Sequence, residues 1–150
     1  FMIEGAQKNL DWAMPSSEAK LLLGDATQLP EVIPSHAHKR IAGFVLDPPY
    51  GRNSQGSLDH AELIEAVLHS SRKVAAKKAG LVLILPMHPF GEFPDEALED
   101  EAEFELLHGQ WSEIKSTFSK TGWRIEQRWV EHVHASLGRL ILHATIVPQD

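Results

Sequence analysis

Short apolar runs alternate with longer amphipathic stretches along most of the chain. Two apolar runs, Leu21 to Leu23 and Ile41 to Leu46, are each followed closely by an acidic residue, and a third, Leu81 to Leu85, stops at Pro86. Continuous apolar runs of this kind are typical of parallel strands that are covered on both faces. The pattern therefore predicts three buried parallel strands.

Four other segments have helical spacing or helix boundary signals. Between Trp111 and Lys120, the residues Trp111, Ile114 and Phe118 share one side, and Gly122 acts as the terminator. The expected helices are Phe1 to Met14 before Pro15, Ser57 to about Ala79 before Gly80, the acidic segment Pro94 to Leu107 before Gly109, and Trp111 to Lys120.

The chain ends in two long strand-like runs with no helix between them. Trp123 to Val133 and Leu140 to Val147 are joined by a short connection from His132 to Arg139, which indicates an antiparallel pair. No internal repeat or low-complexity linker interrupts the chain. We therefore expect one α/β domain over residues 1–150, with a mostly parallel sheet and an antiparallel terminal strand.

The composition fits a globular domain, since 43% of the 150 residues are hydrophobic. The chain has no cysteine, which excludes disulfides and thiolate metal sites and fits a reducing compartment. No apolar run approaches the length of a membrane span, and the first residues lack a signal-peptide pattern. We therefore expect a cytoplasmic protein without membrane contact.

The formal charge of −7 is concentrated in one segment. Eight of the 21 acidic residues lie between Phe90 and Gln110, where there is no Lys or Arg, so the remainder holds 13 acidic against 14 basic residues. This balance neither requires nor excludes a phosphate-bearing partner. For the acidic segment itself we expect a solvated insertion.

The run Asp47-Pro48-Pro49-Tyr50 stands directly after a predicted strand. Proline lacks a backbone donor and restricts the preceding residue to extended geometry, so the two prolines end the strand and hold Asp47 and Tyr50 in defined directions. A simple turn is the structural alternative. The surrounding order of strands and helices favours a functional site.

This run resembles the Asp/Asn-Pro-Pro-Tyr/Phe signature of class I S-adenosylmethionine-dependent amino-methyltransferases, which have a Rossmann-like sheet. In that family the predicted strands, in chain order, match strands three to seven. Strands one and two, with the glycine-rich loop, would lie upstream of Phe1. The resemblance thus implies that residues 1–150 are the C-terminal part of one methyltransferase catalytic domain, truncated at the N-terminus. The family's strand order is 3-2-1-4-5-7-6. Without strands one and two, we expect the last four strands to form a block with Leu21 to Leu23 either detached or paired directly with Ile41 to Leu46.

Three phrases make a narrower resemblance to the THUMP-domain tRNA guanine-N2 methyltransferases. They are Met2-Ile3-Glu4-Gly5-Ala6-Gln7-Lys8-Asn9-Leu10, Gly24-Asp25-Ala26 and Asp47-Pro48-Pro49-Tyr50-Gly51-Arg52. This resemblance implies methyl transfer to an exocyclic base amine, most favourably guanine N2 in tRNA, which would be selected by a THUMP domain that this chain does not contain. The alternatives are a DNA adenine-N6 or cytosine-N4 methyltransferase and a catalytically inert interaction module. Whether the chain is active by itself is left open.

The resemblance also assigns roles to individual residues. Asp47 and the carbonyl of Pro48 would accept hydrogen bonds from the target amine, with Pro49 keeping the geometry and Tyr50 stacking on the base. Gly51 and Arg52 would contact substrate, although Arg52 could equally face solvent. Asp25, Ala26 and Asp47 would bind S-adenosylmethionine, and no metal is required.

Several other residues have simpler interpretations. Asp25 could merely cap the turn that follows it. His132 and His134 share a strand face without an evident third metal ligand, so we interpret them as polar residues of an edge strand. His36 and His38 are interpreted as loop residues. The four tryptophans are expected in the core or in sheet packing.

Overall fold

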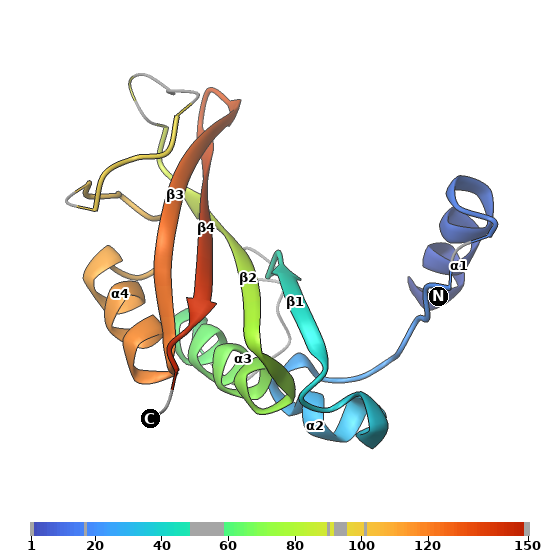
Figure 1. The fold of residues 1–150 in the computed structure, drawn as a ribbon. Helices are drawn as coiled ribbons and strands as arrows, with labels where there is room; N and C mark the ends of the chain where they lie inside the picture. The colour runs from blue at the N-terminus through green and yellow to red at the C-terminus, as the bar shows by residue number, and fades with distance from the viewer. Residues whose placement is uncertain are drawn as a thin grey trace.

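The computed structural model describes residues 2–16, 18–48, 59–89, 91, 96–100 and 102–148, and the fold is shown in Figure 1. The elements in chain order are α1 (Met2–Ala13), η1 (Ala26–Gln28), α2 (Leu29–Val32), η2 (Ser35–Ala37), β1 (Ile41–Leu46), α3 (His60–Val74), β2 (Ala75–Met87), α4 (Trp111–Lys120), β3 (Trp123–His134) and β4 (Leu137–Ile146).

The strands form one four-stranded sheet with the order β1-β2-β4-β3. β1 pairs with β2 in parallel, with Phe44 opposite Leu81, whereas β4 runs antiparallel to both of its neighbours. This is the expected four-strand block, and it confirms the fold class. The β3–β4 connection is shorter than predicted, because β3 continues to His134 and β4 begins at Leu137.

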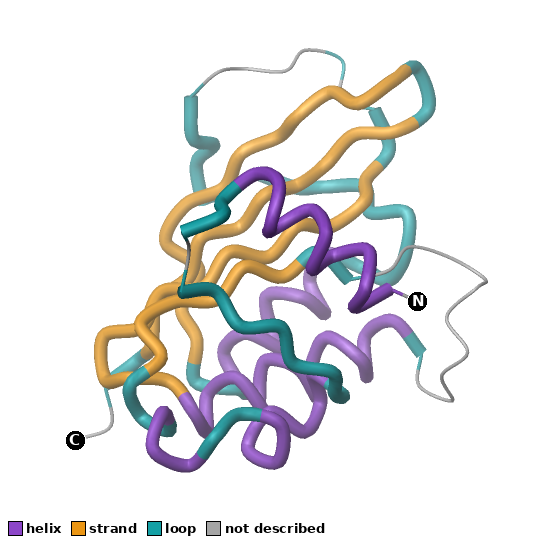
Figure 2. The backbone as a smooth tube through the Cα atoms, turned by 90° about the vertical axis from the view of Figure 1, so that its right-hand side faces the viewer, coloured by secondary structure: helices purple, strands orange, loops and turns teal. Residues whose placement is uncertain are grey.

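Helices α3 and α4 cover one face of the sheet (Figures 1 and 2). The core lies between them and alternate residues of the central strands, including Leu81, Leu83 and Leu85 of β2. Trp123 at the start of β3 is 1% exposed, and its indole N–H donates to the carbonyl of Leu68 on α3 at 3.1 Å. Because of this hydrogen bond, the buried indole N–H is not left unpaired, and α3 is held against the sheet.

The helix boundaries follow from local chemistry. Asp59 caps α3 by accepting from Glu62 N at 2.8 Å, while the Glu62 carboxylate accepts from Asp59 N at 3.2 Å, which together form a capping box. α4 has the predicted bounds and buries Trp111, Ile114 and Phe118. It ends before Gly122, whose φ of 77° suits glycine.

The opening helix is confirmed as α1, which lies apart from the sheet in Figure 1. Its Trp12 is 87% exposed, so the expectation that every tryptophan is a packing residue was wrong at that position. Trp111 and Trp123 are core residues, as predicted, and Trp129 is half-buried.

The predicted strand Leu21 to Leu23 was wrong. These residues form no regular element, and Leu22 and Leu23 are 49% and 86% exposed. A strand needs a neighbour that takes up its backbone hydrogen bonds. Among the described residues, the sheet has four strands, and none pairs with this run, so the detached alternative is the one observed.

The predicted boundary between α3 and β2 also needs correction. The helix stops at Val74 and β2 begins at Ala75, so Gly80 lies inside a strand instead of ending a helix. Pro86 does not break this strand, because Met87 still pairs with Gly138. The pairing of β2 with β1 ends at Leu83, so the missing donor of Pro86 interrupts no ladder on that side. Ser57, the expected cap, lies outside the described residues.

The acidic segment was wrongly predicted as a helix. Its described residues, 96–100 and 102–107, are not helical, and Leu106 forms an isolated antiparallel bridge with Met87. Phe104 and Leu106 alternate like strand residues and are buried. The acids also form ion pairs, between Asp100 and Arg128 and between Glu103 and Lys115. The described part is therefore packed on the domain and is not the solvated insertion that we expected.

Candidate active site

A cavity of about 270 Å³ lies at the carboxyl end of β1. Four elements supply its walls: the end of β1 with the two residues after it, α3, the start of η1, and β2. The lining residues are Ala26, Val45, Leu46, Asp47, Pro48, Leu63, Ile64, Val67, Leu68 and Leu83. The carboxyl edge of a parallel sheet is where open α/β folds bind ligands.

Three of the predicted site residues, Ala26, Asp47 and Pro48, meet at this cavity. β1 ends at Leu46, so Asp47 is the first residue beyond the strand, and its side chain is exposed at the rim. Pro49, Tyr50, Gly51 and Arg52 lie outside the described residues.

The turn that carries Asp25 and Ala26 is built by local hydrogen bonds. Asp25 Oδ1 accepts from both the backbone N and the hydroxyl of Thr27, each at 2.8 Å. These bonds favour the ionised form and hold the pKa of the Asp25 carboxyl below its usual range. The capping role is thus present, and the cofactor role of Asp25 stays a prediction.

Contacts with α3 hold this turn beside β1. Leu29 N donates to the hydroxyl of Ser70 at 2.7 Å, and Ser70 is buried. Gly24, just before the turn, lies so close to Val32 that a Cβ at this position would clash with the valine side chain. Glycine is therefore required here for close packing and not for an unusual φ.

The wall formed by α3 was only partly foreseen. Ile64, Val67 and Leu68 follow helical spacing within the helix that was predicted from Ser57 to about Ala79, whereas no sequence signal pointed to Leu63 and Ser70. Periodicity identifies residues that face inward. It does not reveal that the space between α3 and the end of β1 is left partly open, because that depends on how the two elements pack.

The geometry combines apolar walls with a carboxylate at the rim. Of the ten lining residues that the structure describes, nine are apolar, and Asp47 is charged. Complete small-molecule pockets occupy about 300–1,000 Å³, so a cavity of this size suits one ring system and not a whole nucleotide-sized ligand. Such a site can bury one flat ring between its walls, while Asp47 at the rim can accept hydrogen bonds from a second group outside the cavity.

The histidine pairs do not assemble into a metal site. His134 Nδ1 lies 3.2 Å from the hydroxyl of Ser136 at the β3–β4 turn, and His38 contacts the carbonyl of Ile33 at 2.8 Å. Within the described ranges, no group of three or more His, Asp or Glu side chains could hold a metal ion.

None of the helices in the described part of the chain is both long enough and apolar enough to span a membrane.

The comparisons with known proteins confirm the resemblance to class I S-adenosylmethionine-dependent methyltransferases at the level of the fold. A methyltransferase described as S-adenosylmethionine-dependent from Aquifex aeolicus matches 97% of this chain and 64% of its own, with a TM-score of 0.56 at 16% identity. TrmN from Thermus thermophilus matches 96% of this chain and 33% of its own, with a TM-score of 0.58 at 13% identity.

Two further findings concern particular proteins. The tRNA (guanine(10)-N2)-dimethyltransferase of Pyrococcus abyssi is 27% identical over 138 residues, which cover 92% of this chain. The chain spans about a third of that relative's length, at 33%. A candidate DNA modification methylase from Thermus thermophilus, solved with S-adenosyl-L-methionine, has a TM-score of 0.52 at 16% identity over 85% of this chain and 55% of its own. No family model matches the chain.

Proposed function

We propose that this chain carries the catalytic edge of a methyltransferase that acts on an exocyclic amine of a nucleic-acid base. The observation that supports this most directly is the position of Asp47 and Pro48, just beyond the end of β1 and at the rim of an apolar cavity. Both provide hydrogen-bond acceptors at the edge of the sheet where a ligand ring can be buried.

The chemistry requires acceptors because an exocyclic base amine is a poor nucleophile, with its lone pair delocalised into the ring. The Asp47 carboxylate and the Pro48 carbonyl accept hydrogen bonds from the amine, direct its lone pair out of the ring plane and stabilise the positive charge that develops on nitrogen. Tyr50 and Pro49 complete this motif in the sequence, with the tyrosine ring proposed to stack on a base that has left its helix.

S-Adenosylmethionine is the proposed cofactor, and it supplies a methyl group already activated as a sulfonium. The residues present fit part of that molecule. The apolar walls formed by Val45, Leu63 and Val67 suit a purine face, and Asp25 and Ala26 lie on the turn next to them. A carboxylate such as Asp25 can accept a hydrogen bond from an adenine amine.

Guanine N2 in tRNA is the proposed target. The relative from Pyrococcus abyssi, a tRNA (guanine(10)-N2)-dimethyltransferase, supports it, as does the resemblance of three sequence phrases to those of the THUMP-domain enzymes. The second candidate is a DNA adenine-N6 or cytosine-N4 methyltransferase, which the likeness to the candidate DNA modification methylase favours.

Product analysis separates these functions. The full-length protein is incubated with labelled S-adenosylmethionine and either tRNA transcripts or duplex DNA, and the nucleic acid is then digested to nucleosides. We expect label in N2-methylated guanosine from tRNA. Label in N6-methyladenine or N4-methylcytosine from DNA would replace the RNA assignment, and no transfer to either would contradict the proposed activity.

A further inference from the structure

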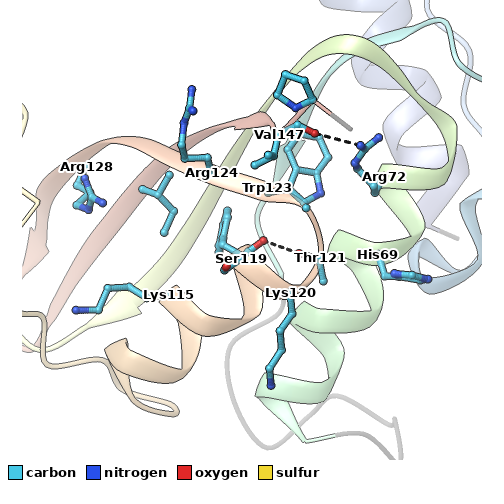
Figure 3. Close-up of a pocket in the computed structure, with 14 residues that line it drawn as sticks. His69, Arg72, Lys115, Ser119, Lys120, Thr121, Trp123, Arg124, Arg128 and Val147 are labelled. Atoms are coloured by element: carbon cyan, nitrogen blue, oxygen red, sulfur yellow. Dashed lines mark hydrogen bonds between the residues drawn. The ribbon is translucent and has the colours of Figure 1, made fainter. Parts of the chain in front are cut away.

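Basic side chains gather at the end of the sheet opposite to Asp47, beside the amino end of β1. A cavity of about 750 Å³ between α3, α4 and β3 and a second of about 640 Å³ next to it share Arg72 and Pro148 in their linings. Figure 3 shows Arg72 and Arg124 on either side of Trp123 in the first cavity. Lys39 and Lys77 line the second.

Some of these positive charges are already neutralised by carboxylates. Arg128 pairs with Asp100, Lys115 with Glu103 at 3.0 Å, and Arg124 with Glu126 at 2.8 Å. Four basic residues have no ion pair within the described ranges, and no acidic residue described there lines either cavity. We call these four residues, Lys39, Arg72, Lys77 and Lys120, the basic strip.

The central member of the basic strip is held in place. Arg72 Nη2 donates to the carbonyl of Val147 at 3.4 Å, which ties the last turn of α3 to the end of β4. Gly122 opposes the same side chain so closely that a Cβ there would lie 3.2 Å from Arg72 Nε. The guanidinium is therefore positioned by the fold, while the three lysines around it are exposed and can reach a ligand.

The basic strip and Asp47 are at opposite ends of the same elements. β1 has six residues, so its first and last Cα atoms are about 17 Å apart at roughly 3.3 Å per residue. In duplex DNA, where phosphates follow one another every ~3.4 Å along a strand, this distance corresponds to roughly five nucleotides. Contacts at the strip are thus separate from contacts at the reacting base.

We infer that the basic strip binds the phosphate backbone of an RNA, at a site separate from the Asp47 cavity. This inference rests on the proposed function and extends it, because it gives the nucleic-acid substrate a second point of contact. Unpaired lysines beside a fixed arginine attract phosphates without reading base sequence. Their contribution must weaken as salt rises, since each phosphate contact releases counterions.

The test uses the full-length protein and an RNA hairpin, with binding measured by fluorescence anisotropy over a series of salt concentrations and without S-adenosylmethionine. Lys77→Gln/Lys120→Gln removes two exposed charges of the strip. Lys8→Gln/Lys20→Gln removes two exposed charges elsewhere and is the matched control. We expect weaker binding and a salt slope shallower by about 1.5 in the first variant, at roughly 0.7–0.9 for each lost contact.

Equal salt slopes of RNA binding for the two double variants would overturn the inference. This is also the result expected if the basic strip binds an acidic protein instead of RNA. Failure here is distinguishable from failure of the proposed function. RNA binding that depends on the strip without any methyl transfer would contradict only the proposed activity. Methyl transfer with RNA affinity insensitive to the strip would contradict only this inference.

Discussion

The two ends of the parallel strands have different chemical surfaces. At the carboxyl end, a cavity of about 270 Å³ with apolar walls lies beside an exposed carboxylate, Asp47. At the amino end, the buried ring of Trp123 closes the core, and basic side chains line two wider cavities around it. The comparison indicates that the carboxyl end suits an apolar ring, whereas the amino end suits an anion.

The largest difference in stability should appear between Trp123 and Leu63. Trp123→Ala removes a fully buried ring together with its hydrogen bond to the carbonyl of Leu68, so we expect a loss of about 3–5 kcal/mol in the free energy of unfolding. Leu63→Ala enlarges an existing cavity and should cost below about 2 kcal/mol. Urea denaturation followed by circular dichroism measures both.

The exposed Trp12→Ala is the control for these two variants and should change stability by less than about 0.5 kcal/mol. A cost at Leu63 equal to that at Trp123 would contradict the difference in burial between these two side chains.

A smaller effect is expected at the cap of α3, the helix that reaches both ends. Asp59→Ala removes the acceptor for Glu62 N and should lower stability by about 1 kcal/mol. Asp59→Asn keeps an acceptor and should cost less. The exposed Asp11→Ala on α1 controls for the loss of one carboxylate. If Asp59→Ala melted at the same temperature as Asp11→Ala, the capping box would not contribute to stability.

The smallest effects concern pH, and the two ends should respond in different windows. Burial, followed by the neighbouring His108, lowers the pKa of His60 from its ordinary 6.5, against the opposing charge of Asp59. As pH falls, His60 therefore becomes protonated in the unfolded chain before it does so in the folded protein. Stability should begin to fall as pH drops below 6.5. His60→Gln should weaken that dependence, as followed by thermal melts at several pH values.

At the amino end, hydrogen bonds from Thr145 and Arg124 lower the pKa of Glu126 from its ordinary 4.5. Its stabilising contribution is present above that value and is lost as pH falls through the lower, folded pKa. Thr145→Val should therefore move the pKa of Glu126 upward in a carbon-13 NMR titration. An unchanged pKa would show that the hydrogen bond from Thr145 to Glu126, at 2.6 Å, does not lower the pKa of Glu126.

The elements that were predicted correctly are those whose signals are local. The bounds of α4 follow from an apolar spacing of three and four residues and from Gly122, and neither signal depends on distant partners. β1 and the terminal pair were equally clear because their apolar runs find partners within the chain. The Leu21 to Leu23 run carries the same signal but has no partner strand in the described part, so the prediction failed.

Two other errors concern residues whose local signal differs from their packing. Gly80 was taken as the stop of a helix that ran to about Ala79, although pairing with β1 and β4 draws this segment into the sheet. In the acidic segment, eight carboxylates hid the alternation of Phe104 and Leu106, which are buried against the domain. In both cases tertiary packing overrode local propensity.

The candidate site was found from the sequence only where a motif marks it. Asp47 and Pro48 stand in a recognisable run, and the structure places them at the cavity rim. The basic strip has no such motif. Its members come from the segment before β1, from α3, from β2 and from α4, and only the fold brings them to one edge.

The central claim is that the carboxyl end is the catalytic end, and Asp47→Ala tests it most directly. In the full-length protein, methyl-transfer kinetics and titration of S-adenosylmethionine are compared for the wild type, Asp47→Ala and the control Asp11→Ala. We expect Asp47→Ala to lower kcat by about 100-fold or more while cofactor affinity stays within a few-fold of the wild type, because Asp47 acts mainly on charge that develops during transfer. Near-normal turnover in Asp47→Ala would contradict the account.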